Sequence, residues 1–392
     1  MSDPGRRLSQ RAQAIPSSGI RRFFDLLASM DDVISLGVGE PDFVTPWSVR
    51  DAAIRSIEEG HTHYTSNFGL VELREQLAVH LDRLYGLAYD PHGEILITSG
   101  VSEGLDIVMR ALIDPGDEVI LPDPAYVAYR PTIQLAGGVP VGLATTADNA
   151  FALDPAAVEA AVTPQTKAIL LGFPANPPGA VLSLDALSAI ARIAIHHDLI
   201  VISDEIYDRL VYGVVHTPIA AIVGMRDRTV TLGGFSKDYA MTGWRVGYVL
   251  AASALLEGIM KIHQYVMMSA PTPSQFAALE ALVSGEEHLV SMRDEYDRRR
   301  RLMYQGLNQI GLACTEPLGA FYAFPSIVST GLDDEAFAEQ LLVQEQVAVI
   351  PGSAFGDGGR GYVRACYATS YADIERALDR IRRFVATRVS AK

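Results

Sequence analysis

The stretch EILITSGVSEGLDIVMRALIDPGDEVIL, residues 94–121, decides the fold class. An apolar, β-rich run covers Glu94–Ser99, a helical pattern covers Ser102–Leu112, and a second β-rich run covers Glu118–Leu121. A strand, a helix and another strand in close succession predict a βαβ unit, because parallel strands need a crossover connection of this length. The sequence therefore predicts an α/β fold with a mostly parallel sheet.

Outside this stretch, three more runs are apolar throughout: Ala168–Phe173, Leu199–Ser203 and Thr229–Phe235. Such runs are typical of strands that are covered on both faces. A leucine stripe with three- and four-residue spacing predicts an amphipathic helix behind the possible cap Asn67; it consists of Leu70, Leu73, Leu77, Leu81 and Leu84. We therefore expect a large domain whose sheet is sandwiched by helices.

The pattern changes from about Glu286 onward. Charge density rises there, and a helical segment is followed by short strand candidates near Phe321–Phe324 and Val347–Ile350. This change predicts a second, smaller α+β domain. The expected division is an N-terminal arm with part of the small domain at residues 1–45, the large domain at 46–285 and the C-terminal small domain at 286–392.

Composition excludes several classes of function. The formal charge of -15, from 32 basic and 47 acidic residues, disfavours nucleic acid and anionic membranes as partners. No run approaches the roughly 20 apolar residues of a membrane span, and Met1–Gln13 lacks the apolar core of a signal peptide. The two cysteines, Cys314 and Cys366, are too few for a disulfide framework. We expect a cytoplasmic protein.

Polar residues follow several predicted strands, at the sheet edge where open parallel sheets bind ligands. Gly100, Val101 and Ser102 open a helix whose free N–H groups suit an anion. Tyr126 follows the next strand, where its ring could stack on a flat heterocycle or simply pack on the surface. Asn176 lies in the stiff turn Pro174–Gly179. Together these residues indicate a binding site at one edge of the sheet.

Two charged residues strengthen this interpretation. Asp204 lies at the exit of a buried strand, where a carboxylate is costly unless a cation stabilises it; a helix cap is the alternative role. Lys237 follows Gly233-Gly234-Phe235-Ser236, and partial burial in such surroundings lowers a lysine pKa. The site therefore combines a carboxylate that needs a cationic partner with an amine that is partly neutral.

Several motifs in order resemble those of the class I aminotransferases of pyridoxal phosphate (PLP) fold type I, in the aspartate aminotransferase superfamily. The matching segments are Gly39–Phe43, Asn176–Gly179, Ser203–Tyr207, Ser236–Arg245, Gly319–Tyr322 and Val363–Arg364. The resemblance implies a homodimeric enzyme that uses pyridoxal 5′-phosphate and moves an amino group from an L-amino acid to a 2-oxo acid by a ping-pong mechanism. Glutamate and 2-oxoglutarate are the implied shared pair, and the large domain is implied to bind the cofactor.

The resemblance also implies roles for the residues at the reacting end. Lys237 matches the lysine that holds the cofactor as a Schiff base and moves a proton between substrate and cofactor. Asp204 matches the carboxylate that pairs with the pyridine nitrogen. Tyr207 and Asn176 match the donors to the phenolic oxygen. Lys237, Asp204 and Tyr207 are thus the expected catalytic residues.

At the other end, the resemblance implies a phosphate site. Ser236, Arg245 and the helix start at Gly100, Val101 and Ser102 match the phosphate ligands. Tyr64 matches a phosphate ligand that reaches over from the partner subunit. Tyr126 matches the ring that stacks on the pyridine face.

For the substrate, Arg364 matches the arginine that binds the α-carboxylate, together with Asn176 and the Gly39 backbone. Ile20 matches an apolar residue of the substrate pocket, with N-terminal packing as the alternative. Ser102 stands where some bacterial aspartate aminotransferases have a lysine, so strict aspartate specificity is not implied.

Other sequence motifs give weaker evidence of function. Gly37-Val38-Gly39 is only a fragment of a dinucleotide fingerprint, and the histidine pairs His61/His63 and His196/His197 lack the spacing of a metal site, so we expect no metal. Two rival functions remain open at this point. One is a PLP-dependent carbon–sulfur β-lyase, and the other is a non-catalytic regulatory domain that keeps PLP as a ligand.

Overall fold

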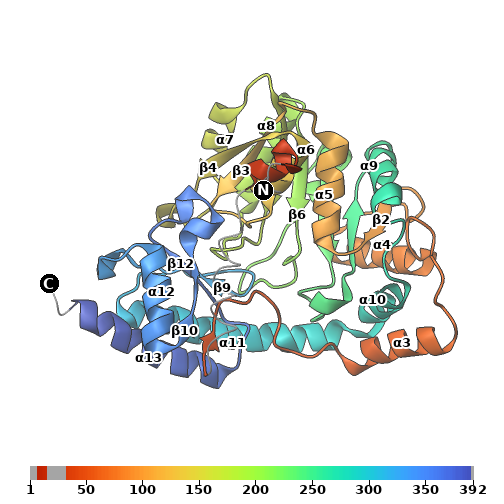
Figure 1. The fold of residues 1–392 in the computed structure, drawn as a ribbon. Coiled ribbons are helices and arrows are strands. Elements are labelled where there is room, and N and C mark those ends of the chain that lie inside the picture. Colours follow the sequence, from red (N-terminus) through yellow and green to blue (C-terminus); the bar gives the residue numbers. More distant parts are fainter. Residues whose placement is uncertain (1–6, 16–31, 390–392) are drawn as a thin grey trace.

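The computed structural model describes residues 7–15 and 32–389, and its centre is a seven-stranded sheet with the order β2-β8-β7-β6-β5-β3-β4 (Figure 1). The strands are β2 (Ile95–Thr98), β3 (Glu118–Asp123), β4 (Val139–Ala144), β5 (Thr166–Gly172), β6 (Ile200–Asp204), β7 (Thr229–Gly234) and β8 (Gly247–Leu250). Only β8 runs antiparallel to its neighbours, and the remaining neighbouring pairs of this sheet are parallel. The predicted mostly parallel sheet is confirmed.

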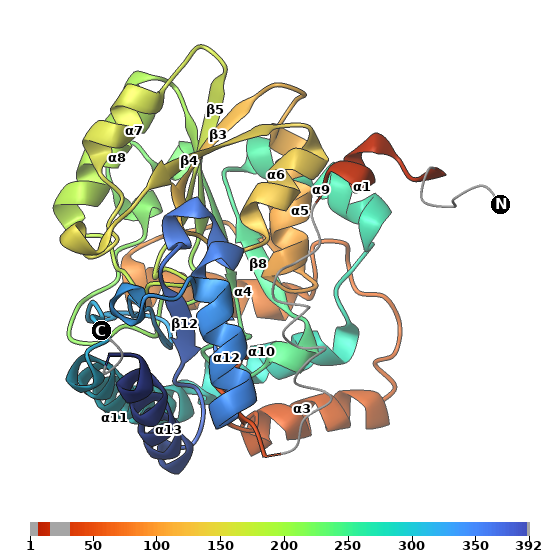
Figure 2. The same cartoon turned by 60° about the vertical axis from the view of Figure 1, so that its left-hand side comes forward.

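Helices cover both faces of this sheet (Figures 1 and 2). One face carries α5 (Val101–Leu112), α6 (Tyr129–Ala136) and α9 (Ser253–Val266), and the other carries α4 (Val71–Tyr85), α7 (Pro155–Ala161), α8 (Leu184–His196) and α10 (Thr272–Ser284). Successive side chains of a strand point to opposite faces of the sheet, which explains the two layers of helices. Leu170 packs with α5, whereas its neighbour Ile169 packs with α8. The predicted sandwich is confirmed.

The leucine stripe of α4 is confirmed as core packing. Leu73, Leu77 and Leu81 are buried on the face of α4 that meets the sheet. The predicted cap at Asn67 is wrong, because the helix begins at Val71 and no side chain caps it. The Leu70 N–H donates instead to Gln275 Oε1 of α10 at 2.7 Å, so a distant helix satisfies this backbone group.

The C-terminal part has its own core. It contains α11 (Glu286–Ile310), α12 (Asp334–Glu345), α13 (Tyr371–Val389) and a three-stranded sheet of β11 (Ile350–Pro351), β12 (Val363–Cys366) and β9 (Tyr322–Ala323). An N-terminal strand, β1 (Ile34–Ser35), pairs in parallel with β10 (Val347–Ala348), and Ile34 and Leu36 belong to the same core. The predicted smaller α+β unit is therefore present, with a contribution from the N-terminal segment.

Two other helices lie outside these layers. Helix α3 (Trp47–Glu58) packs along α10, and α1 (Gln10–Ala14) lies against α6 (Figure 2). Within the described ranges, no helix has both the length and the apolarity to cross a membrane.

Candidate active site

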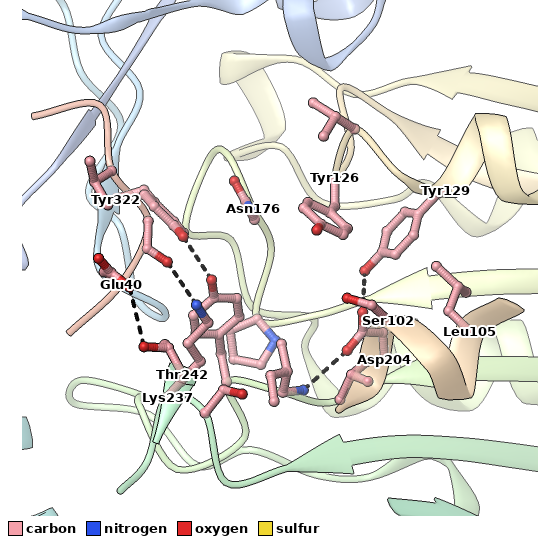
Figure 3. A pocket seen from close by; sticks show the side chains of 18 of the residues that line it. Glu40, Ser102, Leu105, Tyr126, Tyr129, Asn176, Asp204, Lys237, Thr242 and Tyr322 are labelled. Carbon is pink, nitrogen blue, oxygen red and sulfur yellow. Dashed lines mark hydrogen bonds between the residues drawn. The ribbon is translucent and has the colours of Figure 1, made fainter. Parts of the chain in front are cut away.

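A cavity of about 670 Å³ lies where the residues after β6 and β7 meet β9 and β12. Figure 3 looks into it. Most of the predicted site residues line this cavity: Gly39, Val101, Ser102, Tyr126, Asn176, Asp204, Tyr207, Ser236, Lys237, Arg245 and Arg364. Segments that are far apart in sequence thus converge on one space at the carboxyl ends of the central strands.

Lys237 lies in the turn after β7, and its amine faces the cavity (Figure 3). Its Nζ donates to the Gly39 carbonyl oxygen at 2.7 Å, and the ring centroids of Tyr207 and Phe321 lie 5.9 and 5.7 Å away. Burial lowers the pKa of Lys237 to about 8. An appreciable fraction of this amine is therefore neutral, and nucleophilic, near physiological pH.

The Asp204 carboxylate ends β6 and is buried against the cavity. Its Oδ2 accepts a hydrogen bond from the Tyr129 hydroxyl at 2.9 Å, and its Oδ1 accepts one from the Ile206 N–H at 3.3 Å (Figure 3). Burial raises the pKa of Asp204 to about 6. Among residues 7–15 and 32–389, no lysine, arginine or histidine forms an ion pair with it, so the site suits a cationic group of a ligand.

Tyr129 is a site residue that the sequence reasoning missed. It is the first residue of α6 and its ring meets that of Tyr126 edge to face, with centroids 5.5 Å apart. Its spacing of three residues from Tyr126 was the one feature of the sequence that could have indicated a second tyrosine at the site. The hydrogen bond to Asp204 links the start of α6 to the end of β6 across 75 positions of sequence, and only the tertiary structure shows it.

Two phenols meet at the opposite wall. The hydroxyls of Tyr207 and Tyr322 are 2.7 Å apart, and both side chains are buried (Figure 3). Tyr322 belongs to the quoted segment Gly319–Tyr322, yet no role was assigned to it. Tyr322 lies on β9, so it reaches the cavity from the three-stranded sheet of the C-terminal part.

Arg364 on β12 is 4% exposed and reaches the cavity between two partners. Its Nη1 donates to Asn176 Oδ1 at 2.9 Å, and its Nη2 donates to the Gly37 carbonyl oxygen at 2.8 Å. Its Nε is buried and has no partner within the described chain. A guanidinium carries five N–H donors, so several remain for an anion bound in the cavity.

The start of α5 and Arg245 form an anion-binding corner. Gly100 precedes the helix with φ 79°, and a Cβ there would lie 2.7 Å from Arg245 Nη2. Arg245 has φ 54°, and its Nη1 donates to the Thr242 carbonyl oxygen at 3.0 Å. The guanidinium thus lies directly at the positive end of the α5 dipole, an arrangement suited to a phosphate.

Two of the predicted residues that the structure describes, Tyr64 and Gly100, do not line this cavity, and Tyr64 is 78% exposed. Ile20 lies outside the described residues. The sequence reasoning also missed Glu40 and Thr242, which line one edge and share a hydrogen bond of 3.2 Å (Figure 3). The apolar residues Leu105, Val127 and Ile206 complete the lining.

Comparison with known proteins decides the family. The profile of the family "Aminotransferase class I and II" matches residues 31–381. The chain belongs to this family. The Bacillus subtilis protein YugH, named as an aminotransferase without a substrate, is 54% identical over 378 residues, which cover 96% of this chain and 98% of that protein.

Two further aminotransferases resemble this one closely. The aspartate aminotransferase of Pyrococcus abyssi is 45% identical over 95% of this chain and 97% of its own. The crystal structure of the aromatic aminotransferase from Pyrococcus horikoshii OT3 superposes with a TM-score of 0.89 at 43% identity, and the match covers 93% of this chain and 99% of that chain. Similar proteins thus act on chemically different side chains.

Members of this family use pyridoxal phosphate, and the protein is a pyridoxal phosphate-dependent transaminase. The relatives do not favour the carbon–sulfur lyase alternative. The cavity fits this cofactor on its own chemistry. It offers a partly neutral amine for an aldehyde, a buried carboxylate that has no cationic partner in the described part of the chain and suits a pyridinium, and a guanidinium at a helix start for a phosphate.

Proposed function

We propose that this cavity is the transamination site and that Lys237, Asp204 and Tyr207 are its catalytic residues. The reaction moves an amino group from an L-amino acid to a 2-oxo acid in a ping-pong cycle, with glutamate and 2-oxoglutarate as one pair. The observation that carries the proposal is the meeting of a partly buried amine, a buried carboxylate and a buried guanidinium in one space of about 670 Å³.

The ring of the cofactor would lie between Asp204 and the Tyr207 phenol. Pyridoxal phosphate supplies an aldehyde and an electron-accepting pyridinium ring. Asp204 would hold the proton on the pyridine nitrogen, and Tyr126 would stack on the ring face. Tyr207 and Asn176 would donate to the phenolic oxygen. The Asn176 carbonyl oxygen already accepts from Arg364, which turns its amide N–H₂ toward another acceptor.

Lys237 would perform two tasks with one atom. Its Nζ would hold the cofactor through the aldehyde carbon, and as a free amine it would move a proton to or from the substrate Cα. A pKa of about 8 supports both tasks, because an amine that stays fully protonated can neither attack a carbonyl nor accept a proton.

The phosphate would sit at the start of α5. Ser236 and Arg245 would donate from the segment after β7, and Gly100, Val101 and Ser102 would present backbone N–H groups and the helix dipole. The absence of a side chain at Gly100 supports this role, since a Cβ there would lie 2.7 Å from Arg245 Nη2 and would keep the guanidinium from the helix start.

Arg364 would bind the substrate α-carboxylate as a fork, assisted by Asn176 and the Gly39 backbone. We propose Ile20 as part of the substrate pocket as well. The relatives act on aspartate or on aromatic amino acids, so the donor is proposed only as an L-amino acid. Ser102 in place of a lysine argues against strict selection of aspartate. A panel of amino donors with 2-oxoglutarate as acceptor identifies the preferred side chain.

We also propose a homodimer in which Tyr64 of one subunit contacts the phosphate in the other. Tyr64 is 78% exposed, and the Thr272 hydroxyl donates to the neighbouring His63 carbonyl oxygen at 2.7 Å, which holds this segment beside the start of α10. Exposed apolar residues lie on α3 and around the end of α9: Trp47, Ile54, Ile57, Tyr265, Val266, Met267 and Met268. Such a surface supports association with a second copy.

Mixing two inactive variants tests the shared site. Subunits with Lys237→Ala and subunits with Tyr64→Ala should each be nearly inactive alone. In a hybrid dimer, one site receives both changes and the other receives neither, so activity returns on mixing. If Tyr64 served the site of its own subunit, each hybrid site would carry one defect and no activity would return.

The domain boundaries and the location in the cell remain proposals. The core that joins Ile34 and Leu36 to residues beyond 286 supports a division at 1–45, 46–285 and 286–392, and Tyr207, Leu210, Tyr212 and Ala240 of the middle segment also pack into it. Two free, buried cysteines, Cys314 and Cys366, support a cytoplasmic location.

Covalent mapping tests the assignment of the lysine. Borohydride treatment of the cofactor-loaded protein should fix the cofactor to Lys237, and mass spectrometry of the digest should locate it there. Lys261→Ala is the control, because Lys261 lies on the exposed side of α9 and should leave labelling and turnover unchanged. Labelling at any other lysine would refute the assignment.

A further inference from the structure

The buried phenol of Tyr322 contacts three of the proposed functional groups without having a role of its own. Its side chain is 1% exposed, lines the cavity, and comes from β9 in the smaller sheet. Tyr207, whose hydroxyl is 2.7 Å from that of Tyr322, follows β6 of the central sheet. The hydrogen bond therefore joins side chains that two different sheets supply.

The ring face of Tyr322 carries the second contact. The Arg364 guanidinium carbon lies 4.4 Å from the Tyr322 ring centroid, and the Phe355 ring lies 4.9 Å from the same carbon. Strands β9 and β12 pair in antiparallel fashion, with Tyr322 opposite Cys366, which places Arg364 diagonally across the ladder. A cation held against aromatic faces at these distances is attracted and loses freedom to turn.

The third contact is with Gly39. A Cβ at Gly39 would lie only 2.4 Å from the Tyr322 hydroxyl oxygen, so this oxygen packs closely on the Gly39 backbone. The carbonyl of the same residue accepts the hydrogen bond from Lys237 Nζ. One side chain thus contacts the phenol, the guanidinium and the loop that the amine touches.

We propose that Tyr322 is a positioning residue with two separable parts: its hydroxyl donates to the Tyr207 oxygen, and its ring orients the Arg364 guanidinium. This inference rests on the roles proposed above for Tyr207 and Arg364. A phenol that accepts a hydrogen bond is itself a stronger donor, so the hydroxyl of Tyr322 would strengthen the bond from Tyr207 to the cofactor.

The electrostatics support this direction of donation. Burial raises the pKa of both phenols, and for Tyr322 the nearby Arg364 is the strongest influence that opposes the rise. Arg364 opposes the rise for Tyr207 as well, but the hydrogen bond between the two phenols raises the pKa of Tyr207 and lowers that of Tyr322. Tyr322 is therefore the more acidic phenol of the pair, and the more acidic phenol is the better donor.

Two variants separate the two parts. Tyr322→Phe keeps the ring and removes the hydroxyl, whereas Tyr322→Leu removes both. We expect Y322F to lower kcat about 5- to 10-fold, the usual effect of one lost hydrogen bond, with KM for the amino donor changed less than about 2-fold. We expect Y322L also to raise KM for the amino donor and for the 2-oxo acid about 5-fold or more.

A spectroscopic signal provides a readout that does not depend on turnover. The visible absorption of the bound cofactor changes with pH, and a weaker donor to its phenolic oxygen should raise the midpoint of that change by about half a pH unit or more in Y322F. Tyr212→Phe is the matched control. Its hydroxyl is also buried in the smaller core and donates to the Ala320 carbonyl oxygen at 2.6 Å, away from the cavity lining.

Tyr207→Phe distinguishes failure of this inference from failure of the proposed function. If Y207F raises the midpoint while Y322F behaves like Y212F, the positioning role of Tyr322 is overturned and the role of Tyr207 stands. If Y207F leaves the midpoint unchanged, the donor role of Tyr207 fails, and the inference built on it fails with it. A raised midpoint in both variants, with Y212F unchanged, supports the inference.

Discussion

Replacement of Arg364 by alanine is the perturbation whose effect follows most directly from the geometry. Two of its five N–H groups bind Asn176 and Gly37, and the buried Nε has no partner among the described residues. The remaining donors can hold a carboxylate through two parallel hydrogen bonds. Alanine removes this fork, leaves the α-carboxylate without a cation in a buried position, and also releases the Asn176 amide.

The magnitude comes from the cost of unpairing a buried charge. A hydrogen bond to a charged group contributes about 1.5 to 3 kcal/mol, and two such bonds give about 3 to 4 kcal/mol when part of the loss is recovered by water. That free energy corresponds to a fall of about 10²- to 10³-fold in kcat/KM for amino acids and 2-oxo acids alike. Arg364→Lys keeps the charge but loses the fork, so it should recover only part of the loss.

Steady-state kinetics with glutamate and 2-oxoglutarate measure this effect. The absorption of the bound cofactor in R364A serves as the control that the site is still formed. A kcat/KM within about 3-fold of the wild-type value in R364A would contradict the assignment of this arginine to the α-carboxylate, because no bidentate buried contact is that weak.

The other predictions concern the cofactor. Lys237→Ala should abolish covalent cofactor binding and nearly all turnover; if both persist, another lysine carries the cofactor. Burial lowers the pKa of Lys237 to about 8, below the ordinary lysine value of 10.5. Between these two values the folded apoprotein binds fewer protons than the unfolded chain, so its stability should rise with pH across that window. Urea unfolding of the apoprotein should show this rise, and Lys237→Met should remove it. Asp204→Asn should lower kcat about 10²-fold, because an amide cannot keep the pyridine nitrogen protonated; unaltered kcat would exclude that role. Gly100→Ala should weaken cofactor binding about 10-fold, since φ 79° disfavours a side chain and the Cβ would displace Arg245; equal affinity in a cofactor titration would contradict the phosphate corner.

Much of the fold was predictable from local pattern. The apolar runs, the leucine spacing of α4 and the alternation of strand and helix all lie within short windows of sequence, and each appears in the structure within a few residues of its predicted bounds. The cap at Asn67 failed because the N–H at the start of α4 finds its partner in Gln275, which is 205 positions away. No local window contains that information.

The sequence by itself indicated the family through the resemblance of its motifs. It also determined the parallel sheet and which residue types stand where strands end, because backbone preference and apolar periodicity are properties of neighbouring residues. Only the tertiary structure decided which of these groups meet. Tyr129 reaches Asp204 across 75 positions, and Tyr322 reaches Tyr207 across 115. Such contacts depend on the order of the strands and on how the C-terminal part packs against the seven-stranded sheet. Distance along the chain specifies neither the strand order nor this packing.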